Sequence, residues 1–130
     1  MPAAVSTPKF VDNPVIAARA DRYTTITINV GAVLESWRIS LFSYEWLYPD
    51  GRIKALKELP QHEQPKRKDI ESRLSAGDPL EKPVLGIGLM DNIEIGAGRA
   101  TFLTLAAHGC ETIPVHIPVS NSTEFAPFRA

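Results

Sequence analysis

The sequence predicts an α+β fold in which a small mixed sheet packs with helices, and three observations carry that prediction. Residues 23–30 alternate Ile and Val with Thr and Asn, as a half-buried strand does. An apolar run at 84–89 and an alternating segment at 93–95 are separated by Asp-Asn, which indicates a strand hairpin. Residues 99–107 are rich in Phe, Leu and Ala and precede a glycine, which is typical of a buried helix.

Three further segments complete the predicted elements. A helix is favoured over residues 33–48 because large apolar residues recur every three or four positions, although 37–41 also alternates as a strand would. A helix is expected at 66–75, where a glycine follows its last turn. Residues 111–117 form a last strand, which we expect near a sheet edge because Pro114 has no amide hydrogen to donate.

The chain has 130 residues, which favours one domain with a core that needs neither a metal nor disulfides. The domain is expected to cover 23–118. Residues 1–22 contain three prolines and no apolar period, and they predict a tail or an irregular strap. Residues 119–130 are polar, and we expect an irregular C-terminal tail.

Composition excludes several classes of protein. A single cysteine and the absence of a basic-then-apolar leader fit a reducing, cytoplasmic setting. No stretch approaches the ~18 apolar residues of a membrane-spanning helix, so membrane insertion is not expected. The net charge is −1, so any surface for nucleic acid must be local. The three histidines and the cysteine lack metal-ligand spacing.

The most informative segment is the predicted corner between a strand and a helix at residues 93–100. Backbone approaches a ligand closely at glycine, and the first amides of a helix are free donors for an anion. The predicted phosphate site consists of Gly96, Ala97, Gly98, Arg99 and Ala100, with the arginine fork suited to phosphate oxygens. The alternative is that these glycines serve only tight packing.

Carboxylates lie beside this corner. Glu94 shares one side of its strand with Asn92, opposite the apolar side, and Asp91 lies in the adjoining turn. Magnesium is usually held by one or two carboxylates together with substrate oxygens, so Glu94 and Asp91 are candidate ligands. Glu94 could instead orient or deprotonate a water molecule. The alternative is a solvated strand residue next to a turn-forming Asp-Asn pair.

A basic cluster precedes this region in the chain. Lys66, Arg67, Lys68 and Arg73 could neutralise phosphates of DNA. The other interpretation is an ordinary solvated helix face, because Asp69 and nearby acids dilute the charge.

The order of these pieces resembles the ParB/sulfiredoxin superfamily. The matching segments are a helix leading to a Pro-Val strand at 70–84, the Ile-Gly-Ala-Gly-Arg corner at 95–99, and a closing Ile-Pro-Val strand at 112–115. This resemblance implies a compact ParB/sulfiredoxin-like fold. Sulfiredoxins carry Cys and His before the arginine, where this chain has Ala97 and Gly98, so peroxiredoxin repair is not expected. Segregation proteins usually carry a Glu at the position of Ala97 and a downstream DNA-binding motif.

Among short members, the chain is most similar to the plasmid fertility-inhibition factors, on residues 35–42, 83–88 and 92–100. That resemblance implies a protein that blocks DNA transfer through type IV secretion and acts as an ATPase and DNase. We therefore expect a hydrolase that uses ATP and Mg2+, with Glu94 and Arg99 as catalytic residues and Asn92 contacting the nucleotide. Implied partners are DNA, nucleotide, and type IV secretion components or a relaxase–DNA complex. The alternative is a non-catalytic, nucleotide-dependent module that binds DNA or protein.

Overall fold

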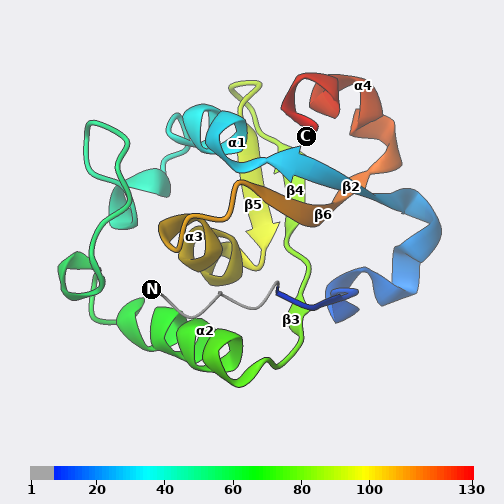
Figure 1. The fold of residues 1–130 in the computed structure, drawn as a ribbon. Helices are drawn as coiled ribbons and strands as arrows, with labels where there is room; N and C mark the ends of the chain where they lie inside the picture. The colour runs from blue at the N-terminus through cyan, green and yellow to red at the C-terminus, as the bar shows by residue number, and fades with distance from the viewer. Residues whose placement is uncertain (1–7) are drawn as a thin grey trace.

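The computed structural model describes residues 8–130, and a four-stranded sheet lies at its centre (Figure 1). The strands lie in the order β2-β6-β4-β5, with antiparallel β2/β6 and β4/β5 pairs around a parallel β6/β4 pair. Their bounds are Tyr23–Asn29 for β2, Val84–Ile87 for β4, Ile93–Ala97 for β5 and Thr112–Pro118 for β6. This mixed sheet, packed with helices, confirms the predicted α+β class.

The helices lie around the sheet and shape the site. α1 (Val30–Trp37) follows β2 directly, and α3 (Arg99–Ala107) lies between the strands and α2 (Gln64–Ala76) in Figure 1. A short parallel pair, β1 (Phe10–Val11) with β3 (Leu80–Glu81), joins the N-terminal segment to the body. The remaining elements are short: 3-10 helices η1 (Pro14–Arg22), η2 (Ser43–Glu45), η3 (Leu56–Glu58), η4 (Val119–Asn121) and η5 (Ala126–Phe128), and α4 (Ser122–Phe125).

The core forms where the inward sides of the strands meet α1 and α3. Trp37, Trp46 and Phe102 are fully buried. Ile93 and Ile95 place the inner side of β5 in the same cluster. Each such side chain contributes roughly 1.5–3 kcal/mol by leaving water, so β5 and the start of α3 are firmly held.

The sequence favours a helix over 33–48, but the helix in the structure, α1, ends at Trp37. The buried Ser40 hydroxyl accepts a hydrogen bond from the Phe42 amide, and serine side chains that bond nearby backbone compete with helix continuation. The strand alternative for 37–41 is not adopted either, and residues 38–42 form a loop.

The edge position expected for the last strand is wrong, since β6 is central in the sheet. The His116 amide donates to the Pro83 carbonyl on the β4 side, and residues two apart in a strand point their amides the same way. Pro114 therefore faces the β4 side, where the β4/β6 ladder is a single pair, Val84 with His116. Because the Pro114 nitrogen faces β4, its missing amide hydrogen does not cost a hydrogen bond between β6 and β2.

The described N-terminal segment (8–22) and the C-terminal segment (119–130) pack against this body. Residues 8–22 form β1 and η1, whereas residues 1–7 of the expected strap lie outside the described residues. The irregular C-terminal conformation we expect is wrong: residues 119–128 are helical, because Phe125 is fully buried and anchors them to the core. Within 8–130, no helix is long and apolar enough to cross a membrane.

Candidate functional site

A groove of about 620 Å³ opens between the loop that follows α1 and the β4–β5 hairpin. Residues 39–42 form one side and residues 88–90 the other. Polar side chains that line it are Ser40, Asn92, Glu94 and Arg99. Loop, hairpin and the start of α3 thus converge on one concave surface, the usual setting of a ligand site.

The alternation of β5 delivers Glu94 to this groove. Ile93 and Ile95 are buried in the core, so the intervening Glu94 points to the opposite side of the strand. The Ile93 amide donates a 2.8 Å hydrogen bond to the Ser36 hydroxyl, which ties β5 to α1. The position of the carboxylate therefore follows from two rigid elements.

Two buried side chains hold the Glu94 carboxylate. The Ser40 hydroxyl donates to Oε1 at 2.6 Å, and Asn92 Nδ2 donates to Oε2 at 3.0 Å. The same Asn92 amide group also donates to the Ile93 carbonyl at 2.9 Å, so its own orientation is fixed. A Cβ at Gly88 would lie 2.8 Å from Cγ of Glu94, so glycine there leaves room for the carboxylate.

Arg99 enters the same groove with donors that lack acceptors. Its guanidinium carbon lies 4.9 Å from the Phe42 ring centre and 5.9 Å from that of Trp37, distances typical of cation–π contact. Among residues 8–130, no carboxylate lies within 4.0 Å of it, and its buried Nε has no hydrogen-bond partner. A buried donor without an acceptor costs about 1–3 kcal/mol. The guanidinium also brings a positive charge to the groove lining, and that charge would stabilise an anionic ligand there.

The predicted phosphate corner is divided in the structure. Gly96 and Arg99 line the groove, whereas Ala97, Gly98 and Ala100 do not. Gly98 has a φ of 75°, and a Cβ there would lie 3.0 Å from the Pro83 Cα, which supports the packing alternative at this position.

The first turn of α3 borders a second, smaller cleft. Thr101 lines this cleft of about 180 Å³, together with Asp69 and Arg73 of α2 and Glu81 of β3. The carboxylates of Asp69 and Glu81 would repel an anion at this cleft. The groove that contains Arg99 is therefore the better site for phosphate.

Asp91 does not join Glu94 in the groove lining. It occupies the left-handed position of the hairpin turn, with a φ of 58°, a conformation that Asp tolerates. Its amide donates to the Gly88 carbonyl at 3.1 Å. No group of three His, Cys, Asp or Glu residues in the described chain could hold a metal. Glu94 could therefore hold Mg2+ only as its single protein ligand. Substrate phosphates and water would have to supply the other ligands of the ion.

The predicted DNA surface on α2 is largely committed to ion pairs. The three pairs are Lys66 with Glu63 at 2.7 Å, Arg67 with Glu71 at 3.2 Å, and Arg73 with Asp69 at 3.1 Å. Arg67 also donates to the Lys54 carbonyl and is mostly buried. Lys68 is exposed and, within the described residues, has no carboxylate within 4.0 Å.

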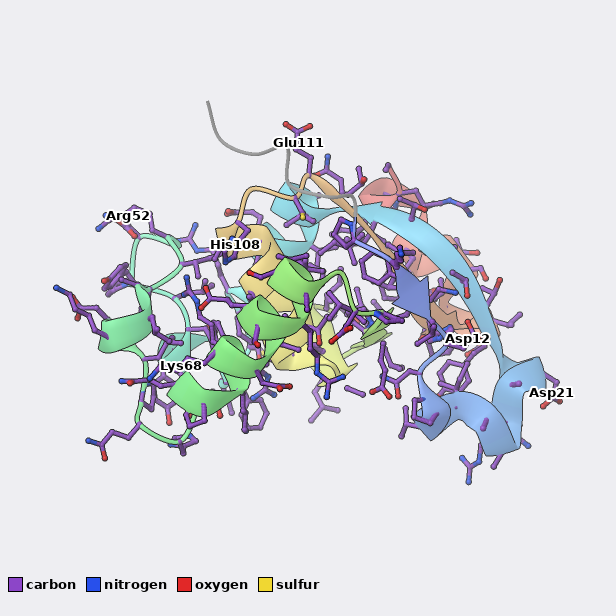
Figure 2. The ribbon with its side chains drawn as sticks, turned by 60° about the horizontal axis from the view of Figure 1, so that its bottom comes forward. Asp12, Asp21, Arg52, Lys68, His108 and Glu111 are labelled. Carbon is purple, nitrogen blue, oxygen red and sulfur yellow. The ribbon has the colours of Figure 1, made fainter. Side chains whose placement is uncertain are left out.

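These four cations do not form one face. Residues 66 and 73 lie seven positions apart and share a side of α2, whereas residues 67 and 68 are turned from Lys66 by roughly 100° and 200°. Burial of Glu63 would raise its pKa, but hydrogen bonds from Lys66 and Trp46 lower it, so Lys66 supports the fold. Figure 2 places Lys68 and Arg52 at one end of the molecule and Asp12 and Asp21 at the other.

Sequence reasoning missed Ser40, Phe42 and Gly88 as parts of the site. Ser40 lies 54 positions before Glu94 in the chain, and no local pattern links the two. The Gly-x-Gly at 86–88 is the one signal that could indicate a close approach by another side chain.

Comparisons of this chain with protein-family models, with curated proteins and with solved structures find no match. The likeness to the ParB/sulfiredoxin superfamily and to fertility-inhibition factors therefore stays a prediction from the sequence.

Proposed function

We propose that this protein binds a nucleoside triphosphate in the groove and hydrolyses it. The observation that carries the proposal is that Arg99, with a buried donor lacking an acceptor, lines the same groove as the fixed carboxylate of Glu94. A cation for phosphate oxygens and a carboxylate for water are the two groups that phosphoryl hydrolysis needs.

Each groove residue has a distinct role in this proposal. Arg99 binds oxygens of the terminal phosphate and stabilises their developing charge. Glu94 accepts a proton from the attacking water as the new P–O bond to the terminal phosphorus forms and the bond to the leaving nucleoside diphosphate breaks. Ser40 and Asn92 are positioning residues, because they hold Glu94 and leave further lone pairs of its oxygens available. If Glu94 holds Mg2+ together with the substrate phosphates instead of accepting the proton, the ion would neutralise phosphate charge.

The same chemistry extends to phosphodiesters, which supports a DNase that blocks DNA transfer through type IV secretion. That extension rests on the resemblance of residues 92–100 to fertility-inhibition factors. Lys68 is exposed on α2 without an ion pair among the described residues, and it would contact the DNA backbone.

A non-catalytic module that binds nucleotide and then grips DNA or protein is the second candidate. Two features favour it. Ala97 stands where segregation proteins of the resembled superfamily usually carry a Glu, and large apolar side chains are exposed beside the groove.

Phosphate release from ATP with Mg2+ tests the proposal when wild type is compared with Glu94→Gln. Glutamine keeps the shape of the side chain, and the Ser40 hydroxyl can reverse to accept from its amide, so the fold should persist. Loss of a general base costs about 10²–10⁴ in rate, so we expect turnover to fall at least a hundredfold.

Glu124→Gln serves as the control, since Glu124 is an exposed, hydrogen-bonded carboxylate on α4 outside the groove. ATP binding without turnover by wild type would favour the non-catalytic module. No binding of ATP by folded wild type contradicts both candidates.

A further inference from the structure

Large apolar side chains are concentrated around the groove. In the part of the chain that the structure describes, nine large hydrophobic residues are exposed, and five of them border the groove. These five, which we call the apolar rim, are Ile39, Leu41 and Phe42 on one side and Leu89 and Met90 on the other. Single exposed apolar residues are ordinary, whereas such a cluster marks a binding surface.

The rim needs a ligand with an apolar or aromatic surface, which a phosphate group does not provide. Leu41 and Leu89 are almost wholly exposed, on opposite sides of the groove. A flat body placed between the two sides would cover both. The Phe42 ring is about half exposed and offers an aromatic surface on which a base can stack, with the Arg99 guanidinium 4.9 Å from its centre.

The charges of the groove argue against duplex DNA. Among the described residues that line the groove, Arg99 is the one cation and Glu94 the one carboxylate. A duplex keeps its bases stacked inside and presents mainly phosphates, so it would gain a single favourable charge contact here. An unpaired nucleotide presents a base face and a phosphate together, which matches the rim and Arg99.

We propose that the groove binds single-stranded nucleic acid, with one unpaired base against the apolar rim and the adjacent phosphate on Arg99. The inference rests on the proposed function in that both place phosphate on Arg99. A mononucleotide such as ATP has the same parts and should compete for the groove. The preference for single-stranded over duplex nucleic acid thus comes from the apolar rim. The cations of α2 would attract the phosphates of either form equally.

Fluorescence anisotropy with a labelled twelve-residue oligothymidylate, alone and annealed to its complement, tests the inference. We expect the single strand to bind at least tenfold more tightly than the duplex. Base stacking is worth about 1–3 kcal/mol per base, so Phe42→Ala, or Leu89→Ser with Met90→Ser, should weaken single-strand binding by about tenfold and leave duplex binding unchanged. Val15→Ser and Val119→Ser are matched controls, because both residues are exposed apolar side chains away from the groove.

Equal or tighter duplex binding, or rim variants with unchanged single-strand affinity, would overturn the inference. Loss of self-association in the rim variants without a change in oligonucleotide affinity would assign the rim to a protein interface and also overturn it. ATP turnover measured on the same samples separates the two proposals. Rim-dependent binding of the single strand without ATP turnover contradicts only the proposed hydrolase, whereas turnover without strand preference contradicts only this inference.

Discussion

The Ser40 hydroxyl donates a 2.6 Å hydrogen bond to Oε1 of Glu94, so a residue of the loop after α1 fixes a carboxylate on β5. The same loop also contacts the start of α3, where the Arg99 guanidinium lies 4.9 Å from the Phe42 ring centre. The shape of the groove therefore depends on the conformation of the loop at 38–42 that follows α1.

Ser40→Ala should impair turnover more than it impairs folding. The change removes one of the two donors to Glu94, and a hydrogen bond of this kind contributes about 1–3 kcal/mol. We expect hydrolysis to fall by about tenfold or more while ATP affinity changes little. Hydrolysis kinetics and thermal unfolding of Ser40→Ala measure both effects. Ser122→Ala is the control for loss of a serine donor, because the Ser122 hydroxyl likewise donates one hydrogen bond, to the Val119 carbonyl, and lies outside the groove. A change in affinity with unaltered turnover would remove Ser40 from the positioning of Glu94.

Lys68→Glu should weaken DNA binding without loss of stability. Lys68 has no ion pair within the described residues, so its reversal breaks none. Each lost phosphate contact lowers the slope of log affinity against log salt by about 0.9 for duplex DNA. The measurement is DNA affinity across a salt series, with Lys9→Glu as a charge-matched control on the N-terminal segment.

Lys66→Glu differs, because it places a second carboxylate beside the buried Glu63. We expect a lower melting temperature for Lys66→Glu in addition to any effect on DNA. If Lys68→Glu leaves the slope of log affinity against log salt unchanged, α2 does not contact the DNA.

His116 should make stability fall in mild acid. Its ring is buried, Nε2 accepts the Asn13 amide at 3.1 Å, and Nδ1 lies 3.2 Å from the Thr25 hydroxyl. Burial lowers the pKa of His116; Asp12 opposes this shift and Lys82 adds to it. The unfolded chain then binds more protons than the folded one below about pH 6.5, so stability decreases as pH falls from there toward the lowered pKa.

Thermal unfolding between pH 7 and pH 5 measures this effect, with His116→Gln as the comparison. Burial would raise the pKa of Glu63 and of Glu71, but hydrogen bonds and nearby positive charges outweigh it and lower both pKa values. These two acids therefore lose their stabilising contributions only below the pH 5–7 interval of the experiment. We expect the variant to have a flatter profile over this interval. An equally steep profile would assign the acid sensitivity to other groups.

Local patterns predicted the elements that carry the site. Residues 99–107 combine apolar residues with flanking glycines, and α3 spans those residues. Alternation placed Glu94 opposite Ile93 and Ile95, as β5 does. These features depend on residues within one turn or one strand, so the sequence alone contains them.

Features that depend on distant contacts could not be predicted. The position of β6 in the sheet depends on how far β4 extends beside Pro114. The C-terminal helices depend on a place in the core for Phe125. Glu94 lies 54 positions beyond Ser40 in the chain, so their meeting depends on how the loop at 38–42 packs against β5.

The central claim is that Arg99 binds the phosphates of a nucleotide. Titration of ATP with Mg2+ into wild type, Arg99→Lys and Arg99→Ala by calorimetry, with thermal unfolding of the same samples, tests it most directly. A charge-assisted hydrogen bond is worth roughly 1.5–3 kcal/mol, so Arg99→Ala should weaken ATP binding by about tenfold to a hundredfold, and lysine should restore only part of it. Unchanged ATP affinity in a folded Arg99→Ala variant, with a lowered melting temperature, would contradict the account and assign Arg99 to the packing of Trp37 and Phe42.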